Sequence, residues 1–277
     1  MTDWTPPSLP ELPVDAHKGD AGRVLLVAGS AWMPGAAILA ARAAQRAGAG
    51  LVGVLVTDDL LRHVLPQAAP ESVLVDPSTL DLSPGKWHAG LVGPGIGLGE
   101  PARNLVRRII AEFDAPLVID ADALTVLAQE PGLARKRRSA TVVTPHAGEA
   151  ARLLAREVPG EPTARSAAAR EIAQKTGAIC CLKGQRTVVA TGERVYVNQT
   201  GNNGLATAGA GDVLAGIATA YLALVTTLEN PRFTAFDAAA RAVWVHGRAG
   251  DLARAARVSR SLIASDLIDS LSSAQNA

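Results

Sequence analysis

Short apolar runs rich in Val, Ile and Leu recur along the chain and alternate with longer stretches that have helical spacing. The runs lie at 23–29, 51–57, 72–76, 89–95, 116–120, 140–145, 178–184, 187–191 and 194–198. Most are apolar at every position, which is typical of strands covered by helices on both faces. The pattern predicts an α/β fold in which a mostly parallel sheet lies between two layers of helices.

Some of the intervening stretches predict helices with recognisable ends. Residues 35–48 stop at Gly48, and residues 163–177 begin with Thr163 as a cap and stop at a glycine. Other helices are expected over 100–113, 212–226, 234–254 and 261–272. The last two apolar runs flank Gly192-Glu193, which predicts a hairpin and an antiparallel edge late in the sheet.

No internal repeat, low-complexity linker or break in composition divides the chain. We therefore expect one domain over residues 1–277, with the proline-rich residues 1–16 forming an N-terminal arm.

Composition narrows the class of protein. The 277 residues are 48% hydrophobic and carry 27 basic against 26 acidic side chains, a formal net charge of +1. This balance predicts neither nucleic acid nor an anionic membrane as a partner. The first residues lack the features of a secretion signal, and no run approaches the roughly 20 apolar residues of a membrane span. Cys180 and Cys181 are adjacent and are expected to be buried, reduced thiols, so we predict a cytoplasmic protein.

Polar and glycine-rich loops follow the predicted strands. They lie at 28–37, 93–100, 120–124, 144–149 and 183–187, and a further loop at 200–212 leads from the hairpin into a helix. Ligands bind beyond the carboxyl ends of parallel strands, so these loops are expected to form one cleft. Neither the G-x-G-x-x-G fingerprint nor the P-loop pattern fits any of them.

The loop at 200–212, TGNNGLATAGAGD, has its own chemistry. Small residues at 209–211 let backbone N–H groups from 209 to 213 turn toward a ligand, and a helix start adds its positive dipole end. Asp212 then lies where a phosphate would bind, and a carboxylate there can take a proton from an attacking hydroxyl. From these residues alone, an ordinary N-cap role for Asp212 stays equally open.

Seven motifs in order resemble one family. They are HKGDAGRVLLVAGS (17–30), PGAA (34–37), GPGIG (93–97), IDADAL (119–124), TPHAGE (144–149), LKGQRTVVA (182–190) and TGNNGLATAGAGDVLAG (200–216). Together they resemble the ADP-dependent (S)-NAD(P)H-hydrate dehydratases, which have the ribokinase-like three-layer α/β/α fold. The resemblance implies a hydro-lyase that converts the 6S form of hydrated NADH or NADPH (NADHX, NADPHX) back to the reduced nucleotide while ADP becomes AMP and phosphate.

The same resemblance implies roles for particular residues. Asp212 matches the family's catalytic base. The positions that match substrate contacts are Ala36, Gly95, His146 and Asp212 itself. The adenine nucleotide is expected to contact Lys183, Gly184, Gln185, Arg186, Thr187 and Gly211. Eukaryotic relatives use ATP, so ATP is possible here too. Mg²⁺, with unassigned ligands, and a homotetramer are also implied.

The chain departs from the family pattern in two ways. The common GTGD appears as GAGD at 209–212, which loses a hydroxyl but keeps a small backbone. The epimerase domain that often precedes this one is absent from the sequence, so interconversion of the 6R and 6S forms is expected to occur spontaneously or on a separate polypeptide.

Several residues keep two interpretations. Glu149 either holds magnesium through water or caps the helix from 147, and Lys183 either reaches phosphate or is a surface lysine. Asp120 and Asp122 either act as a pair or ligate a metal, or Asp122 caps a helix. Asn202 and Asn203 either shape the loop or bind a ligand, and Trp32 either stacks on a base or packs under its loop.

Two rival functions stay open. They are a kinase of a vitamin alcohol with the same fold and a non-catalytic nucleotide sensor.

Overall fold

The computed structural model describes residues 4–228, 232–256 and 258–276 and contains one nine-stranded sheet. The strand order is β3-β2-β1-β4-β5-β6-β7-β8-β9, parallel from β3 to β7 and antiparallel for β7–β8 and β8–β9. The strands are β1 Arg23–Val27, β2 Leu51–Leu55, β3 Ser72–Val75, β4 Ala89–Val92, β5 Leu117–Ile119, β6 Thr141–Val143, β7 Ile179–Leu182, β8 Val188–Ala190 and β9 Val195–Val197. Each predicted strand and the late antiparallel hairpin are therefore confirmed.

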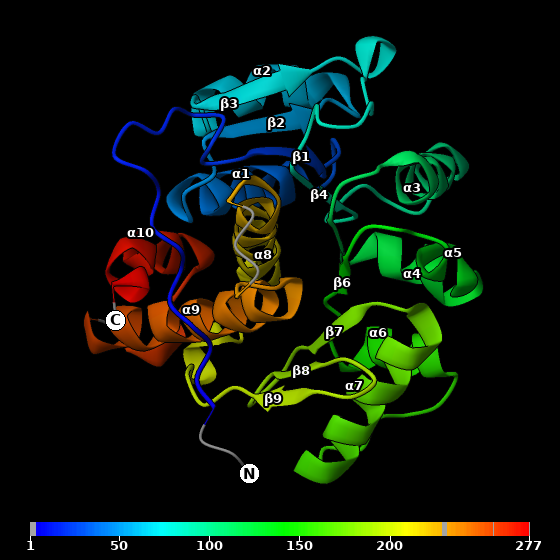
Figure 1. Cartoon of the computed structure of the whole chain (residues 1–277), viewed down its shortest axis with the longest axis vertical. Coiled ribbons are helices and arrows are strands. Elements are labelled where there is room, and N and C mark those ends of the chain that lie inside the picture. The colour runs from blue at the N-terminus through cyan, green and yellow to red at the C-terminus, as the bar shows by residue number, and fades with distance from the viewer. Residues whose placement is uncertain (1–3, 229–231, 257, 277) are drawn as a thin grey trace.

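Helices cover both faces of the sheet (Figure 1). One face carries α1 Pro34–Arg46, α2 Asp59–Ala68, α8 Ala210–Thr227, α9 Ala235–Ala256 and α10 Ala264–Gln275. The other carries α3 Glu100–Glu112, α4 Asp122–Gln129, α5 Gly132–Arg135, α6 Ala147–Leu154 and α7 Pro162–Thr176. Short 3₁₀ turns are η1 Pro77–Thr79, η2 Asn203–Leu205 and η3 Ser259–Ser261. The predicted three-layer α/β/α arrangement is confirmed.

The central strands are apolar throughout because each one contributes to two cores. In β1, Val24 and Leu26 belong to the core under α1 and α8, whereas Leu25 and Val27 belong to the core under α3 and α4. Successive strand residues point to opposite faces, so a strand buried on both sides needs no polar position. The edge strand β3 differs: Val73 is 48% exposed, so two-sided burial is not met there.

Helix ends follow local chemistry with one correction. Gly48 follows α1 with φ = 103°, and Gly177 ends α7 in the left-handed region, as predicted. The N-cap of α7 is Glu161 rather than Thr163, and no side chain caps this end. Pro162 opens the helix, since proline lacks an N–H group that would need a partner there.

Two further features bear on the sequence predictions. The expectation that no run approaches a membrane span is wrong by length and composition, because helix α8 has 18 residues with a mean hydropathy of 1.4; however, 72% of it is buried, as in a core helix. Cys180 and Cys181 are buried and unbridged, as expected.

The described part of the N-terminal segment crosses α9 in Figure 1. Trp4 packs edge-on against Tyr196, with 5.3 Å between the ring centroids, and residues 1–3 lie outside the described chain.

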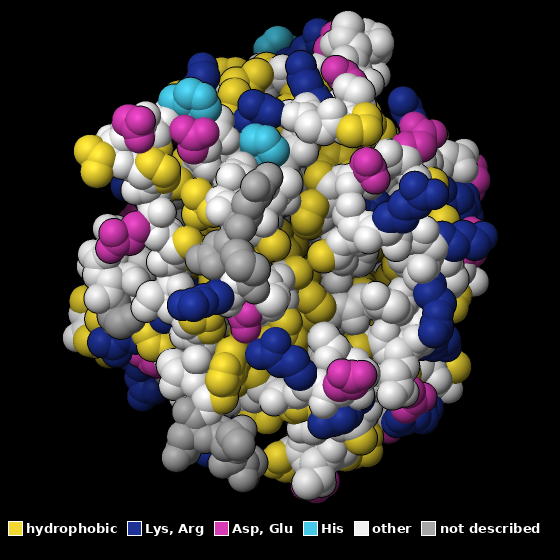
Figure 2. Space-filling view, in the orientation of Figure 1, with side chains coloured by type: hydrophobic (Ala, Val, Ile, Leu, Met, Phe, Trp, Pro, Cys, Tyr) yellow, Lys and Arg dark blue, Asp and Glu magenta, His cyan; other side chains and the backbone are white. Residues whose placement is uncertain are grey.

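Basic and acidic side chains are both spread over the molecular face shown in Figure 2. The basic stretch at 134–139 has a structural use. Arg137 is half-buried and donates hydrogen bonds to the carbonyls of Ile110, Phe113 and Ala115. Its guanidinium therefore ties α3 to the following loop instead of facing solvent.

Candidate functional site

The site begins where the strand order reverses. Strands β1 and β4 are neighbours, but the chain continues from them toward opposite edges of the sheet. Such a switch point opens a crevice between the two following loops. The N–H of Gly29 donates to the carbonyl of Pro94 across it at 2.7 Å. Ala36 and Gly95 meet here: Gly95 has φ = 65°, and a Cβ on it would lie 2.8 Å from the Cβ of Ala36.

Helix α8 starts beside this crevice. Gly209 is its N-cap, with φ = 84°, and a Cβ there would lie 2.4 Å from a methyl of Leu39 in α1. A side chain at 209 would therefore be strained by both conformation and space. Gly211 allows a second close approach, because a Cβ on it would lie 3.5 Å from Nζ of Lys183. The small residues of the loop thus bring α8 against α1 and Lys183.

Asp212 is the third residue of α8, so the N-cap interpretation is wrong. Fewer backbone N–H groups are available to a ligand here than the predicted set from 209 to 213. The N–H of Ala210 bonds to the carbonyl of Thr207, and that of Val213 bonds to the carbonyl of Gly209. The N–H groups of Gly209, Gly211 and Asp212 donate to no atom of the described residues, which leaves three donors at a helix N-terminus for an anion.

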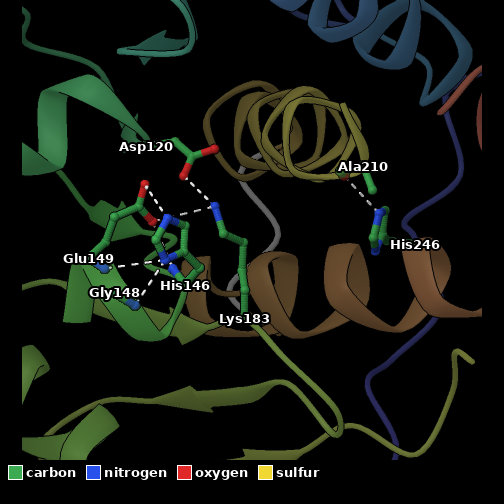
Figure 3. A network of polar contacts seen from close by, with 7 residues as sticks. All are labelled: Asp120, His146, Gly148, Glu149, Lys183, Ala210 and His246. Carbon is green, nitrogen blue, oxygen red and sulfur yellow. Dashed lines mark hydrogen bonds and ion pairs between the residues drawn. The ribbon is translucent and has the colours of Figure 1, made fainter. Parts of the chain in front are cut away.

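Lys183, Asp120 and Glu149 form an ion-pair network (Figure 3), and the charges of Asp120 and Lys183 act on the carboxyl of Asp212. Nζ of Lys183, at the end of β7, is 2.7 Å from Oδ1 of Asp120 and 3.8 Å from Oε2 of Glu149. Lys183 is 18% exposed in its side chain and Asp120 only 2%, so Lys183 is not a surface lysine. Burial opposes the charge on Lys183, but Asp120 and Glu149 outweigh it and raise its pKa, so the amine stays protonated.

The carboxyl of Asp212 has an unusual acidity. Burial, and then the negative charge of Asp120, raise its pKa to about 6, against the opposing effect of Lys183. A carboxylate with a pKa near neutrality accepts a proton more readily than a solvated one yet is still mostly ionised at pH 7. The position suits a general base.

His146 and Glu149 form the N-terminal cap of α6. Nδ1 of His146 accepts from the N–H groups of Gly148 and Glu149, and the Glu149 carboxylate accepts from the N–H of His146. This reciprocal pair is a capping box, so capping by Glu149 is confirmed. The His146 side chain remains 55% exposed, and its substrate contact stays a prediction.

A cavity of about 570 Å³ is lined in part by Lys183. All six residues predicted to hold the adenine nucleotide line it: Lys183, Gly184, Gln185, Arg186, Thr187 and Gly211. Asn202 and Asn203 also line it, with structural partners. Asn202 accepts from the N–H of Gly204 and donates to Asp251, and Asn203 accepts from Arg254.

Other candidates are separated by the structure. Asp122 caps nothing with its side chain and instead accepts from the N–H of Gly97 at 2.8 Å, which fixes the loop after β4. Asp120 bonds to Lys183, so the two aspartates have different partners. Trp32 is 93% exposed, which rules out packing under its loop; stacking on a base stays a prediction.

Sequence reasoning missed two residues of this region. Arg165 in α7 donates to the carbonyls of Leu182 and Lys183 and so holds the end of β7. His246 in α9 lines the cavity and bonds to the carbonyl of Ala210. Both lie inside helices and belong to no loop motif, so only helix packing reveals them.

Comparison with known proteins identifies the family. A family model described as NAD(P)H-hydrate dehydratase matches residues 24–273. The chain belongs to this family. It is 39% identical to an ADP-dependent (S)-NAD(P)H-hydrate dehydratase of Neisseria meningitidis, with 91% of this chain and 84% of that protein covered.

Two further family members show how much of a relative the chain represents. A bifunctional NAD(P)H-hydrate repair enzyme of Moorella thermoacetica is 37% identical, with 97% of this chain but 52% of that protein covered. The chain therefore spans about half the length of that relative. A crystal structure of the ADP/ATP-dependent NAD(P)H-hydrate dehydratase of Bacillus subtilis, co-crystallised with ATP/Mg²⁺, superposes with a TM-score of 0.82 at 29% identity, covering 97% and 94% of the two chains.

Proposed function

We propose that the protein dehydrates the 6S hydrate of NADH or NADPH in a reaction that converts ADP to AMP and phosphate. The main support is the arrangement around Asp212. Its carboxyl, with a pKa raised to about 6, stands at the start of α8 with three backbone amides that donate to no atom of the described residues. The Ala36–Gly95 contact at the β1/β4 switch point offers a place for the hydrated nucleotide, and the cavity beyond Lys183 offers one for ADP.

The chemistry follows from a poor leaving group. Hydroxide leaves C6 of the hydrated ring slowly, so the 6-hydroxyl is first phosphorylated by ADP. Asp212 takes the hydroxyl proton as the oxygen attacks the β-phosphorus, and the bond to the bridging oxygen breaks to release AMP. The ring-nitrogen lone pair then expels phosphate from C6. Loss of a proton from C5 restores the double bond of the reduced nicotinamide.

The surrounding residues stabilise the charge that moves. The amides of Gly209, Gly211 and Asp212 can donate to the oxygens of the transferring phosphoryl group, and Lys183 adds a buried positive charge beside Gly211. Fixed donors in a site that excludes water stabilise such charge without reorganising. Lys183 therefore serves the nucleotide and counters the negative charge of Asp120.

Mg²⁺ is expected from the family, and its fit depends on the donors present. Within the described residues, no three His, Cys, Asp or Glu side chains are grouped to hold a metal ion, and Asp120 is bound by Lys183. These residues do not fit an all-protein magnesium site. An ion held mainly by phosphates and water is the usual alternative for Mg²⁺, and no step above depends on it.

The deciding experiment offers hydrated NADH and ADP separately and together. Recovery of the near-ultraviolet absorbance of reduced nicotinamide only when both are present, with equal AMP and phosphate, supports the proposal. A stable phosphate ester would indicate the rival kinase of a vitamin alcohol, and ADP binding without turnover would indicate a nucleotide sensor. Running ATP and hydrated NADPH in parallel settles the preferred co-substrate and substrate.

Three broader expectations accompany this function. They are a cytoplasmic location, a homotetramer and a separate epimerase for the 6R form. Light scattering of the purified protein tests the assembly, and dehydration of 6R hydrate by this protein alone would remove the need for an epimerase.

A further inference from the structure

His246 is a histidine of the cavity wall that the mechanism above does not use. It projects from α9, and its Nε2 lies 2.9 Å from the carbonyl oxygen of Ala210, the first residue of α8 (Figure 3). A carbonyl oxygen only accepts hydrogen bonds, so Nε2 must carry the proton of this pair.

The opposite ring nitrogen is then defined by chemistry. Burial lowers the pKa of His246 to about 4, so the ring is neutral near pH 7 and Nδ1 carries only a lone pair. Nδ1 makes no hydrogen bond to an atom of the described residues, and this nitrogen is not fully buried. The His246 side chain lines the cavity and its Nδ1 keeps some accessible surface, so a ligand bound there can reach this acceptor.

An adenine nucleotide offers few groups that match an acceptor. Its phosphate oxygens accept hydrogen bonds, so the available donors are the ribose hydroxyls and the 6-amino group of the base. His246 is bonded to the residue next to Gly211, where the unbonded amides and Lys183 favour phosphate. The ribose, which is attached directly to the phosphates, is therefore the nearer of the two donors.

We propose that Nδ1 of His246 accepts a hydrogen bond from a ribose hydroxyl of the adenine nucleotide. The proposal depends on the proposed function only in taking that nucleotide as the occupant of the cavity. The bond to Ala210 fixes both the ring orientation and the tautomer, so the acceptor is oriented before the ligand arrives.

The test is equilibrium binding by calorimetry with the full chain and no hydrated dinucleotide. ADP, 2′-deoxy-ADP, 3′-deoxy-ADP and inosine diphosphate are titrated into wild type, His246→Phe and, as a control, His63→Phe on the exposed surface of α2. We expect His246→Phe to weaken ADP about three- to tenfold, the effect of one neutral hydrogen bond. One deoxy analogue should bind wild type and His246→Phe equally, and His63→Phe should match wild type throughout.

Several results would overturn the proposal. One is an unchanged ADP affinity in His246→Phe, and another is an equal loss of affinity for ADP and both deoxy analogues. The third is a loss of affinity in wild type for inosine diphosphate alone, which would place the contact at the base. If His246→Phe does not fold, wild type still decides, since it must prefer ADP over one deoxy analogue. If wild type binds no adenine nucleotide, the proposed function itself fails.

Discussion

Replacing Asp212 with asparagine should stabilise the free protein at neutral and alkaline pH. Burial raises the folded-state pKa of Asp212 to about 6 from its ordinary value of 3.8, so folding disfavours the ionised carboxylate. A shift of this size corresponds to about 3 kcal/mol of destabilisation when the group is charged in both states. The asparagine side chain would keep the shape of the carboxyl group without its charge. Catalytic groups often lower stability in this way, so that removing one raises stability and lowers activity.

The sign of the pH dependence follows from the raised pKa. As pH falls through about 6, the folded state takes up the proton first and the destabilisation is relieved. Below the ordinary pKa of 3.8 both states are protonated and the destabilisation is gone. The advantage of Asp212→Asn should therefore be full at about pH 8 and fade between about pH 6 and pH 4.

Chemical denaturation at about pH 8 and about pH 5 measures this effect. The matched control is Asp269→Asn, the same change at an exposed position of α10, which should leave the free energy of unfolding within about 0.5 kcal/mol of wild type. A stability of Asp212→Asn equal to or below that of wild type at the higher pH would refute the argument that Asp212 is a desolvated, destabilised base.

Three other changes probe the supports of the site. Lys183→Met should lower the free energy of unfolding by about 3–5 kcal/mol and weaken ADP binding, because it leaves buried carboxylates without their cation. Denaturation and calorimetry measure the two effects, and a wild-type value for either would contradict a stabilising ion pair. Gly209→Ala should cost at least about 1–2 kcal/mol, since φ is 84° and the methyl would meet Leu39; an unchanged melting temperature would contradict this. Cys180 and Cys181 should not react with thiol reagents until the protein unfolds, because burial raises the pKa of both thiols, and rapid labelling of native protein would contradict that burial.

The strands were predictable because their signal is local. A run that is apolar at every position, as in 23–29, fits a strand buried on both faces whatever its neighbours are. The exposure of β3 was not predictable from its own residues, since the order of the strands makes it an edge. Helix α2 was missed although Leu61 and Leu65 give it a buried face, because Pro66 interrupts the pattern.

The loops of the site were predictable, but their pairings were not. The motif positions at 183–187 and 211 do line one cavity, as the shared edge of a parallel sheet requires. The contact between Lys183 and Asp120 joins residues 63 positions apart and depends on β5, β6 and β7 being consecutive neighbours. His246 had no signal at all, since it lies within a helix and meets Ala210 only through the packing of α9 on α8.

The rate of dehydration by wild type and Asp212→Asn, measured across pH with varied ADP and hydrated NADH, tests the central claim most directly. We expect wild-type kcat/KM to fall as pH drops through about 6, because the base is then protonated. Asp212→Asn should bind both nucleotides but turn over at least about 100-fold more slowly at every pH. Turnover by Asp212→Asn near the wild-type rate, with the same pH profile, would contradict the account.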